Sequence, residues 1–381
     1  MSCTRRLGVV LVGLAYYPGK SPSDKTFMRD VANAAVVEHS VTVHIISIAE
    51  TRRWSDLTAT VTDHFAPVEY VPRPFHHVSA VESCSLAHAR HGAAREYCER
   101  SIAALALTRV LKRLRTSGGV SYVHFFDNLG PTASLAAHAA GLRCGVTLLA
   151  SRGSSVSAAR RLFWRVSCRG VDDVVAGSTA MAEALESSGV RVKAVIPWGP
   201  GVSTDVGATP FHLRRLAVWT GRLSSCGADE LMLAAQAMQL ARRSVPELIA
   251  QVWPKPEYAR EYSSIAASYG MPASVPGSSF VKALDQVRVL VSPTPGPNHI
   301  AGPPLTWLEA IRMGCRVVTT PCRGLAAELT ESEAVVVAAE RSAPALSAAI
   351  ERAWRRPAPR LPTVWTARDA AERYVDLWRN G

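Results

Sequence analysis

The sequence has few of the features that mark a metal-bound or disulfide-stapled protein. Its eight cysteines are scattered over 381 residues, without a C-x-x-C pair or a Cys/His grouping at zinc spacing. No Asp-x-Asp triplet is placed to hold a metal ion. We therefore expect reduced thiols in a cytoplasmic setting and no metal site.

Long apolar runs are also missing, since none approaches the roughly 18 residues that span a bilayer. Arg5 and Arg6 precede an apolar run at residues 7–15, which is the one ambiguity about targeting. That run ends in YYPG at 16–19 rather than at a small-residue cleavage site, and a helical pattern follows. We interpret it as a buried parallel strand, and we expect a cytoplasmic protein with peripheral contact to the inner membrane face left open.

Nucleic-acid motifs are absent as well. The sequence contains no zinc finger, no RNP-like aromatic strand and no C-terminal lysine run, so no nucleic-acid partner is expected. The net charge of +12 and the pI near 9.6 nevertheless favour anionic partners. Nucleotides and acidic membranes both meet that description.

The composition, with 48% apolar and 19% charged residues, is that of a globular chain long enough for two cores. Short apolar runs alternate with helical stretches in two successive series, which predicts α/β domains with parallel sheets. We expect two facing, Rossmann-like, doubly wound domains with a cleft between them. We expect residues 1–203 to form the first domain, 213–355 to form the second, and 356–381 to carry a last helix that packs back on the first. One domain can hold a nucleotide and the other the group that accepts what the nucleotide carries.

The expected elements follow the apolar runs. The predicted strands are Leu7–Leu14, Thr42–Ile48, Tyr122–Phe126, Val146–Leu149, Asp173–Ala176, Leu216–Trp219, Leu248–Val252, Val287–Ser292, Arg316–Thr319 and Ala334–Val337. The predicted helices are Lys25–Glu38, Ala89–Arg115, Thr132–Ala140, Thr179–Ser188, Asp229–Arg243, Glu257–Tyr269, Leu305–Met313, Pro344–Arg355 and Ala367–Trp378.

Two segments of the second series carry candidate chemistry. Arg222 stands just past a predicted strand end, where its planar fork could clamp a diphosphate; alternatively Gly221 makes a turn and Arg222 is a solvated charge. Further on, Gly302 and two prolines open a helix whose amino end suits a phosphate. Glu309, in its second turn, could accept both hydroxyls of a ribose, or merely sit favourably in an early turn.

The order of these pieces resembles the retaining nucleotide-sugar transferases of family four, which share the GT-B fold. The resemblance covers nearly the whole chain, and it implies that 1–203 is the acceptor-side domain and 213–355 the nucleotide-sugar-binding domain. The segments that carry it are 16–19 (YYPG), 122–127 (YVHFFD), 172–178 (DDVVAGS), 195–202 (VIPWGPGV), 220–224 (TGRLS), 308–310 (LEA) and 314–320 (GCRVVTT).

The resemblance implies the transfer of a sugar from a UDP- or GDP-sugar, with retention at the anomeric carbon and no metal or other cofactor. Arg222, on the turn at Gly221, would contact the donor diphosphate and Glu309 the donor ribose. Gly302 would face the phosphates, and Gly19 would let backbone N–H groups approach donor or acceptor. The acceptor stays open between a sugar, a lipid-linked group and a small molecule.

Three departures from the family pattern put catalytic competence in question. The family's lysine after the arginine falls at Cys226, and the first glutamate of its Glu, seven residues, Glu pattern falls at Ala301. The family's histidine at an amino-domain strand end is replaced by Arg152. Arg152 or Lys25 could supply the missing positive charge if it pointed into the cleft.

These departures support two rival hypotheses. The first is an impaired homologue that acts as a binding or accessory subunit. The second is a sugar-nucleotide epimerase or hydrolase on the same fold, for which His124 with Asp127 is the candidate acid/base pair. A lone histidine at an apolar strand end is alternatively a structural residue with satisfied hydrogen bonds.

Residues 160–169 (RRLFWRVSCR) mix arginines with bulky apolar side chains. This pattern suits a helix lying on an anionic membrane surface. It equally suits a helix with one buried face and one charged face. The sequence does not assign Trp198, Trp219, Trp253 and Trp307 to the core or to a sugar site.

Overall fold

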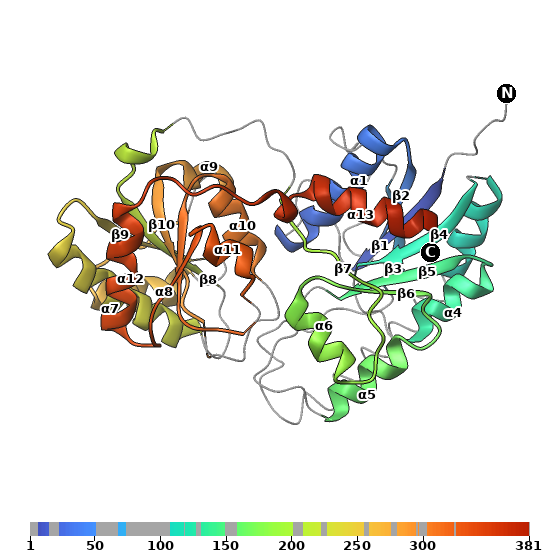
Figure 1. Cartoon of the computed structure of the whole chain (residues 1–381), viewed down its shortest axis with the longest axis horizontal. Coiled ribbons are helices and arrows are strands. Elements are labelled where there is room, and N and C mark those ends of the chain that lie inside the picture. The colour runs from blue at the N-terminus through green and yellow to red at the C-terminus, as the bar shows by residue number, and fades with distance from the viewer. Residues whose placement is uncertain are drawn as a thin grey trace. The chain divides into compact units, whose positions relative to one another are not determined.

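The computed structural model divides the chain into two compact units (Figure 1). It describes residues 7–14, 23–50, 68–73, 107–117, 119–126, 131–148, 158–200, 209–221, 227–254, 259–275, 280–294, 296, 303–323 and 325–380. Among these, residues up to 148, 158–200 and 367–380 form the first unit, and 209–366 form the second. Within the described ranges, no helix is long and apolar enough to cross a bilayer.

The first unit is a parallel sheet with helices between successive strands. Its strands are β1 Gly8–Leu14, β2 Thr42–Glu50, β3 Val68–Arg73, β4 Val120–Phe125, β5 Arg143–Leu148, β6 Asp173–Ala176 and β7 Ala194–Val195. Its helices are α1 Ser23–His39, α4 Pro131–Ala139, α5 Ala158–Ser167, α6 Thr179–Glu186 and α13 Ala367–Asn380, and residues 107–117 are also helical.

The strands of this sheet are arranged in the order β3-β2-β1-β4-β5-β6-β7, and every pair is parallel. The chain builds outward from β1 in one direction and then from β4 in the other. Such a reversal leaves a crevice at the carboxyl ends of the two central strands, which is where doubly wound sheets bind ligands.

Helix α13 comes from the end of the chain but belongs to the first unit, where it lies beside α1 (Figure 1). One face is buried through Tyr374, Val375 and Trp378, so the helix extends the core. Arg368 pairs with Glu38 of α1 at 2.7 Å on the solvent side. Most of the stability that this docking supplies comes from the apolar face, because exposed ion pairs contribute little.

The second unit repeats the same architecture. Its strands are β8 Leu216–Gly221, β9 Ile249–Pro254, β10 Val287–Val291, β11 Arg316–Thr319 and β12 Val335–Val337. Its α-helices are α7 Gly227–Ser244, α8 Ala259–Ser268, α9 Phe280–Ala283, α10 Leu305–Arg312, α11 Ala327–Glu331 and α12 Ala343–Arg355. The 3-10 turns are η3 Phe211–Leu213, η5 Leu284–Gln286 and η6 Thr363–Trp365.

The strand order here is β12-β11-β10-β8-β9, again parallel throughout, so the reversal falls between β8 and β10. Helices α7 and α12 pack together over one face and supply much of the core. Trp219 at the end of β8 is 1% exposed and meets Tyr262 of α8 edge to face, with ring centroids 5.2 Å apart. Both units are therefore doubly wound α/β sheets, as the sequence predicts.

The elements that the sequence analysis did not predict are short or lie at sheet edges. Strand β3 contains Glu69 and Pro72, which a central strand would not tolerate, and it forms one edge of its sheet. Strand β7 is two residues long and forms the other edge. Helices α9 and α11 have four and five residues, too few for a visible period. The predicted helix Ala89–Arg115 is described only from residue 107.

Candidate functional site

Three of the eight residues that the sequence singles out can be placed. His124, Gly221 and Glu309 lie within the described residues. The other five, Gly19, Asp127, Arg152, Arg222 and Gly302, lie outside them, and so does the side chain of Lys25. The site is therefore built from the strands and helices that flank these positions.

His124, on β4, is completely buried in the first unit. Its Nε2 lies 2.7 Å from the Thr147 hydroxyl, and its Nδ1 accepts a hydrogen bond from the indole N–H of Trp378 at 3.3 Å. The rings of Phe126 and Tyr374 lie against the imidazole, with centroids 4.9 and 5.0 Å away. Both ring nitrogens are thus engaged by core side chains.

Burial lowers the pKa of His124 from 6.5 to about 3, since charging the ring would cost its solvation, and the carboxylate of Asp173 offsets only part of this. The imidazole is neutral at physiological pH. This environment is that of the structural histidine that the sequence analysis held as the alternative to an acid/base pair with Asp127.

In the second unit, the strands that lead to the two segments with candidate chemistry end at the same edge of the sheet. Strands β8 and β10 pair directly, with Trp219 opposite Val291, so both end at this edge. Gly221 is the last residue of β8, and Arg222 follows it in the chain. Helix α10, which starts at Leu305 after Pro304, follows β10. The sheet topology thus brings the strand-end glycine near the end of β10, from which the chain continues to Glu309.

Hydroxyl groups form hydrogen bonds to the backbone at this edge of the sheet. The Thr319 hydroxyl donates to the Ser292 carbonyl at 2.8 Å, and the Thr320 hydroxyl accepts from the Thr294 N–H at 2.9 Å. The indole of Trp307, on α10, donates to the Ser292 hydroxyl at 2.8 Å. These bonds fix the chain as it leaves β10 and tie α10 to the strand, which preorganises the edge.

Glu309 is 9% exposed on α10, and one carboxylate oxygen, Oε2, accepts two hydrogen bonds from Arg312, at 3.0 and 2.7 Å. The two residues are three apart on one helix, where side chains are neighbours. These two bonds orient the carboxylate. The i, i+3 spacing was visible in the sequence, but the sequence analysis did not use it.

Arg341 is a second cation at this edge, and the sequence analysis did not identify it. It lies between β12 and α12, and its Nε donates to the Thr294 carbonyl at 2.9 Å. The side chain is exposed, and within the described ranges it forms no ion pair. Arg341 also acts on Glu230, in the first turn of α7, whose pKa burial raises from 4.5 to about 7.

Residues 214–356 match the sequence model of the family described as glycosyl transferases group 1. The match spans β8 to α12 and so includes every element of the edge described above. The second unit is therefore similar to the group 1 glycosyltransferases. No curated protein sequence matches the chain.

Solved structures with the same arrangement extend the likeness over the whole chain. Sucrose-phosphate synthase from Thermosynechococcus elongatus has a TM-score of 0.68 at 14% identity, covering 98% of this chain and 99% of its own. Anabaena HepE, solved in complex with UDP and glucose, has a TM-score of 0.60 at 13% identity, covering 99% and 100%. UDP-GlcNAc 2-epimerase from Neisseria meningitidis, bound to UDP-GlcNAc, has a TM-score of 0.59 at 13% identity, covering 98% and 100%. The fold is that of the GT-B glycosyltransferases, as the sequence predicts.

The tryptophans of the second unit that the sequence left unassigned belong to its core. Trp219, Trp253 and Trp307 are each at most 5% exposed. Trp198, in the first unit, is 7% exposed and packs edge to face on Phe27, with centroids 6.3 Å apart. None of the four presents an open ring face to a sugar in this structure.

Within the described residues, one trio of metal-ligand types lies together in the first unit: His138, Cys144 and Asp172 have ligand atoms within 4.8 Å of one another. Each is already engaged. His138 Nε2 lies 2.6 Å from the Gly170 carbonyl, and Asp172 accepts the backbone N–H of Cys144 at 2.7 Å. Burial raises the pKa of the Cys144 thiol to about 12, so it stays protonated. These contacts fasten the turn before β6 to β5.

Proposed function

We propose that the chain is a retaining glycosyltransferase that takes a sugar from a UDP- or GDP-sugar and passes it to a hydroxyl acceptor. The observation that carries the proposal is the pairing of β8 with β10 inside a unit similar to the group 1 glycosyltransferases. That pairing puts the end of β8, which precedes Arg222, beside the end of β10, from which the chain continues to Glu309. A phosphate clamp and a ribose acceptor at one sheet edge are what a nucleotide-sugar donor requires.

In this proposal, cations and helix ends neutralise the donor diphosphate. The bond between the anomeric carbon and the diphosphate breaks, and negative charge develops on the leaving oxygen. The acceptor hydroxyl oxygen bonds to the same carbon from the same face and gives its proton to that diphosphate oxygen. Arg222 contacts the diphosphate, and the amino ends of α7 and α10 add the positive ends of their dipoles. Glu309, oriented by Arg312, accepts the ribose hydroxyls.

Arg341 takes the place of the family lysine that is missing at Cys226. It reaches the same edge from β12, and its Nε bond to the Thr294 carbonyl fixes the guanidinium while the exposed side chain keeps its charge. A bond from such a cation to a phosphate oxygen is worth roughly 1.5 to 3 kcal/mol. Glu230, whose pKa is about 7, adds little opposing charge below that pH.

The environment of His124 does not favour an epimerase mechanism that relies on this residue. An acid/base residue must reach its substrate proton directly or through one water. His124 is fully buried, and Thr147 and Trp378 occupy its two nitrogens. The similarity to the UDP-GlcNAc 2-epimerases is one of fold alone. Their structures have TM-scores of 0.56 or more, but their sequences are at most 13% identical to this chain.

The test is calorimetric titration of the whole chain with UDP and with GDP, repeated on Arg341→Gln. The control is Arg352→Gln, because Arg352 is also an exposed arginine of this unit that donates to a backbone carbonyl, that of Val337 at 3.2 Å. We expect one nucleotide to bind, with Arg341→Gln weakening it about tenfold or more and the control leaving it unchanged.

Three outcomes are distinguishable. Binding that Arg341→Gln weakens, together with release of sugar from the matching nucleotide sugar, supports the transferase. Binding without sugar release to water or to any acceptor supports an accessory subunit. If neither nucleotide binds, the donor site proposed for this edge is wrong.

A further inference from the structure

Helix α5 exposes apolar side chains where a water-soluble helix would expose polar ones. Leu162, Phe163 and Val166 are 61, 36 and 43% exposed. The face that packs on the unit carries Trp164 and Ser167, each 5% exposed. The sequence left open a helix with one buried face and one charged face, but the outward face of α5 is apolar as well as basic.

Arginines flank this apolar stripe. Arg161 and Arg165 lie one turn apart on the exposed side of α5, and Arg169 follows in the turn after the helix. The Nε of Arg165 donates to the carbonyl of Ser188, and among the described residues Arg165 forms no ion pair. In the described part of the chain, Arg161 and Arg169 form no ion pair.

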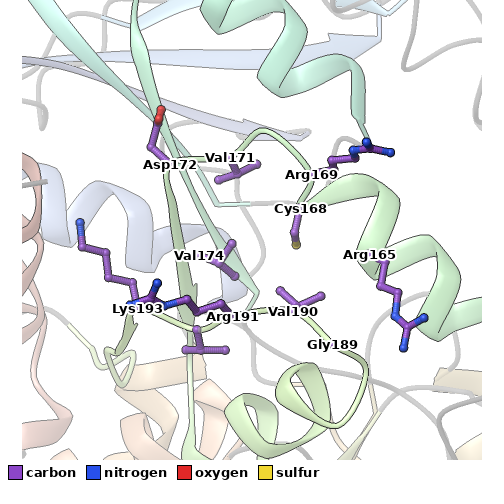
Figure 2. Close-up of a pocket in the computed structure, with 11 residues that line it drawn as sticks. Arg165, Cys168, Arg169, Val171, Asp172, Val174, Gly189, Val190, Arg191 and Lys193 are labelled. Carbon is purple, nitrogen blue, oxygen red and sulfur yellow. The ribbon is translucent and has the colours of Figure 1, made fainter.

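A hollow of about 620 Å³ adjoins the helix, between the end of α5 and the segment that leads into β7. Figure 2 shows Cys168, Val174 and Val190 in its interior. The charged ends of Arg165 and Lys193 lie on opposite sides and point away from each other (Figure 2). Lys193 is paired with the buried carboxylate of Asp173, so the arginines are the cations that this rim offers to anionic groups on a broad surface.

We propose that α5 and the rim of this hollow dock the protein on an anionic lipid bilayer. The apolar stripe of Leu162, Phe163 and Val166 would enter the headgroup region, and the surrounding arginines would pair with lipid phosphates. An acidic protein surface would satisfy the charges, but it gives no reason for three exposed apolar side chains on one helix. The bilayer accounts for both.

The position of this surface leaves the ligand edge of its own sheet free. The hollow lies where β6 begins, at Asp173, and just before β7. These are the amino ends of parallel strands, whereas doubly wound sheets bind ligands at the carboxyl ends. A bilayer bound here would not cover the carboxyl edge. The proposal is independent of which nucleotide or acceptor the protein uses.

The test is flotation of the full chain with vesicles, either of phosphatidylcholine alone or of equal parts phosphatidylcholine and phosphatidylglycerol. A first variant, Leu162→Ser with Val166→Ser, removes the apolar stripe. Its control is Val37→Ser on α1, where a valine of the same unit is 62% exposed on a helix outside the proposed surface.

A second variant, Arg161→Gln with Arg169→Gln, removes two of the charges. Each arginine near an anionic surface contributes about 1 kcal/mol, or about fivefold in partition coefficient, so this pair should weaken binding about 25-fold. Arg109→Gln, on the 107–117 helix, is the matched control for charge because it is exposed and in the same unit. Circular dichroism and thermal melting of each variant check that the fold is kept.

Binding to the anionic vesicles alone, lost with added salt and weakened by both variants but by neither control, would support the proposal. Equal binding to neutral vesicles would overturn the role of charge, and equal binding of all variants would overturn the role of α5. If no vesicle binds and the protein is instead retained on immobilised polyglutamate, the surface is one for an acidic protein and the proposal is wrong.

Discussion

The environment of His124 predicts a specific loss of stability in acid. The folded protein keeps this imidazole neutral down to about pH 3, whereas in the unfolded chain it takes up a proton near pH 6.5. The stability that the neutral imidazole contributes to the folded state is therefore fully present above pH 6.5, and it is lost progressively as the pH falls toward 3. Each pH unit between these values costs about 1.4 kcal/mol, so lowering the pH from 7 to 5 should cost about 2 kcal/mol through this residue.

Hydrogen exchange of the β4 amides measures this loss in the first unit alone. The free energy of opening would be followed from pH 7 to pH 5 in the wild type and in His124→Gln, which cannot titrate. Only the slope against pH is compared, because the substitution also alters packing. Equal slopes in the wild type and His124→Gln would refute the buried, neutral histidine.

Further predictions concern a turn, an ion pair and a donor contact. Gly314, at φ 81° after α10, should tolerate alanine poorly, so Gly314→Ala lowers stability by about 1 to 2 kcal/mol in thermal melts, whereas Gly296→Ala, in open space, does not. Asp173→Asn removes the charge of a buried, ion-paired carboxylate and should lower the free energy of unfolding in urea by about 1 to 3 kcal/mol. Glu351→Gln, in an exposed 3.9 Å pair, should change it by less than about 0.5 kcal/mol. Because Glu230 has a pKa of about 7, nucleotide affinity should fall as the pH rises through 7, and calorimetry on Glu230→Gln should find this dependence flattened; an unchanged profile would remove Glu230 from the donor edge.

The strands that the sequence predicts best are buried on both faces. Asp173–Ala176 and Arg316–Thr319 are found with the predicted bounds, because a central parallel strand is a short apolar run between breakers. The edge strand β3 was missed because a strand with one free side can carry a proline and a glutamate. Sequence periodicity therefore identifies the central strands of the first sheet and misses its edge strands β3 and β7, whereas both edge strands of the second sheet, β9 and β12, were predicted.

The candidate site divides in the same way. Glu309 could be found from local spacing, since it stands on the helix that a glycine and two prolines open. Arg341 could not, because only the order of strands brings the end of β12 to the edge where β10 ends. The enclosure of His124 likewise depends on Trp378, which comes from the last helix of the chain. Contacts between segments that are distant in the sequence cannot be predicted from local sequence patterns.

The most direct measurement of the central claim is hydrogen exchange of the whole chain with and without a saturating UDP- or GDP-sugar. If the donor binds at the carboxyl edge of the second sheet, protection should appear at the end of β8, at the end of β10 and in the first turn of α10, and little in α5. Protection confined to the first unit, or none with either donor, would contradict the account.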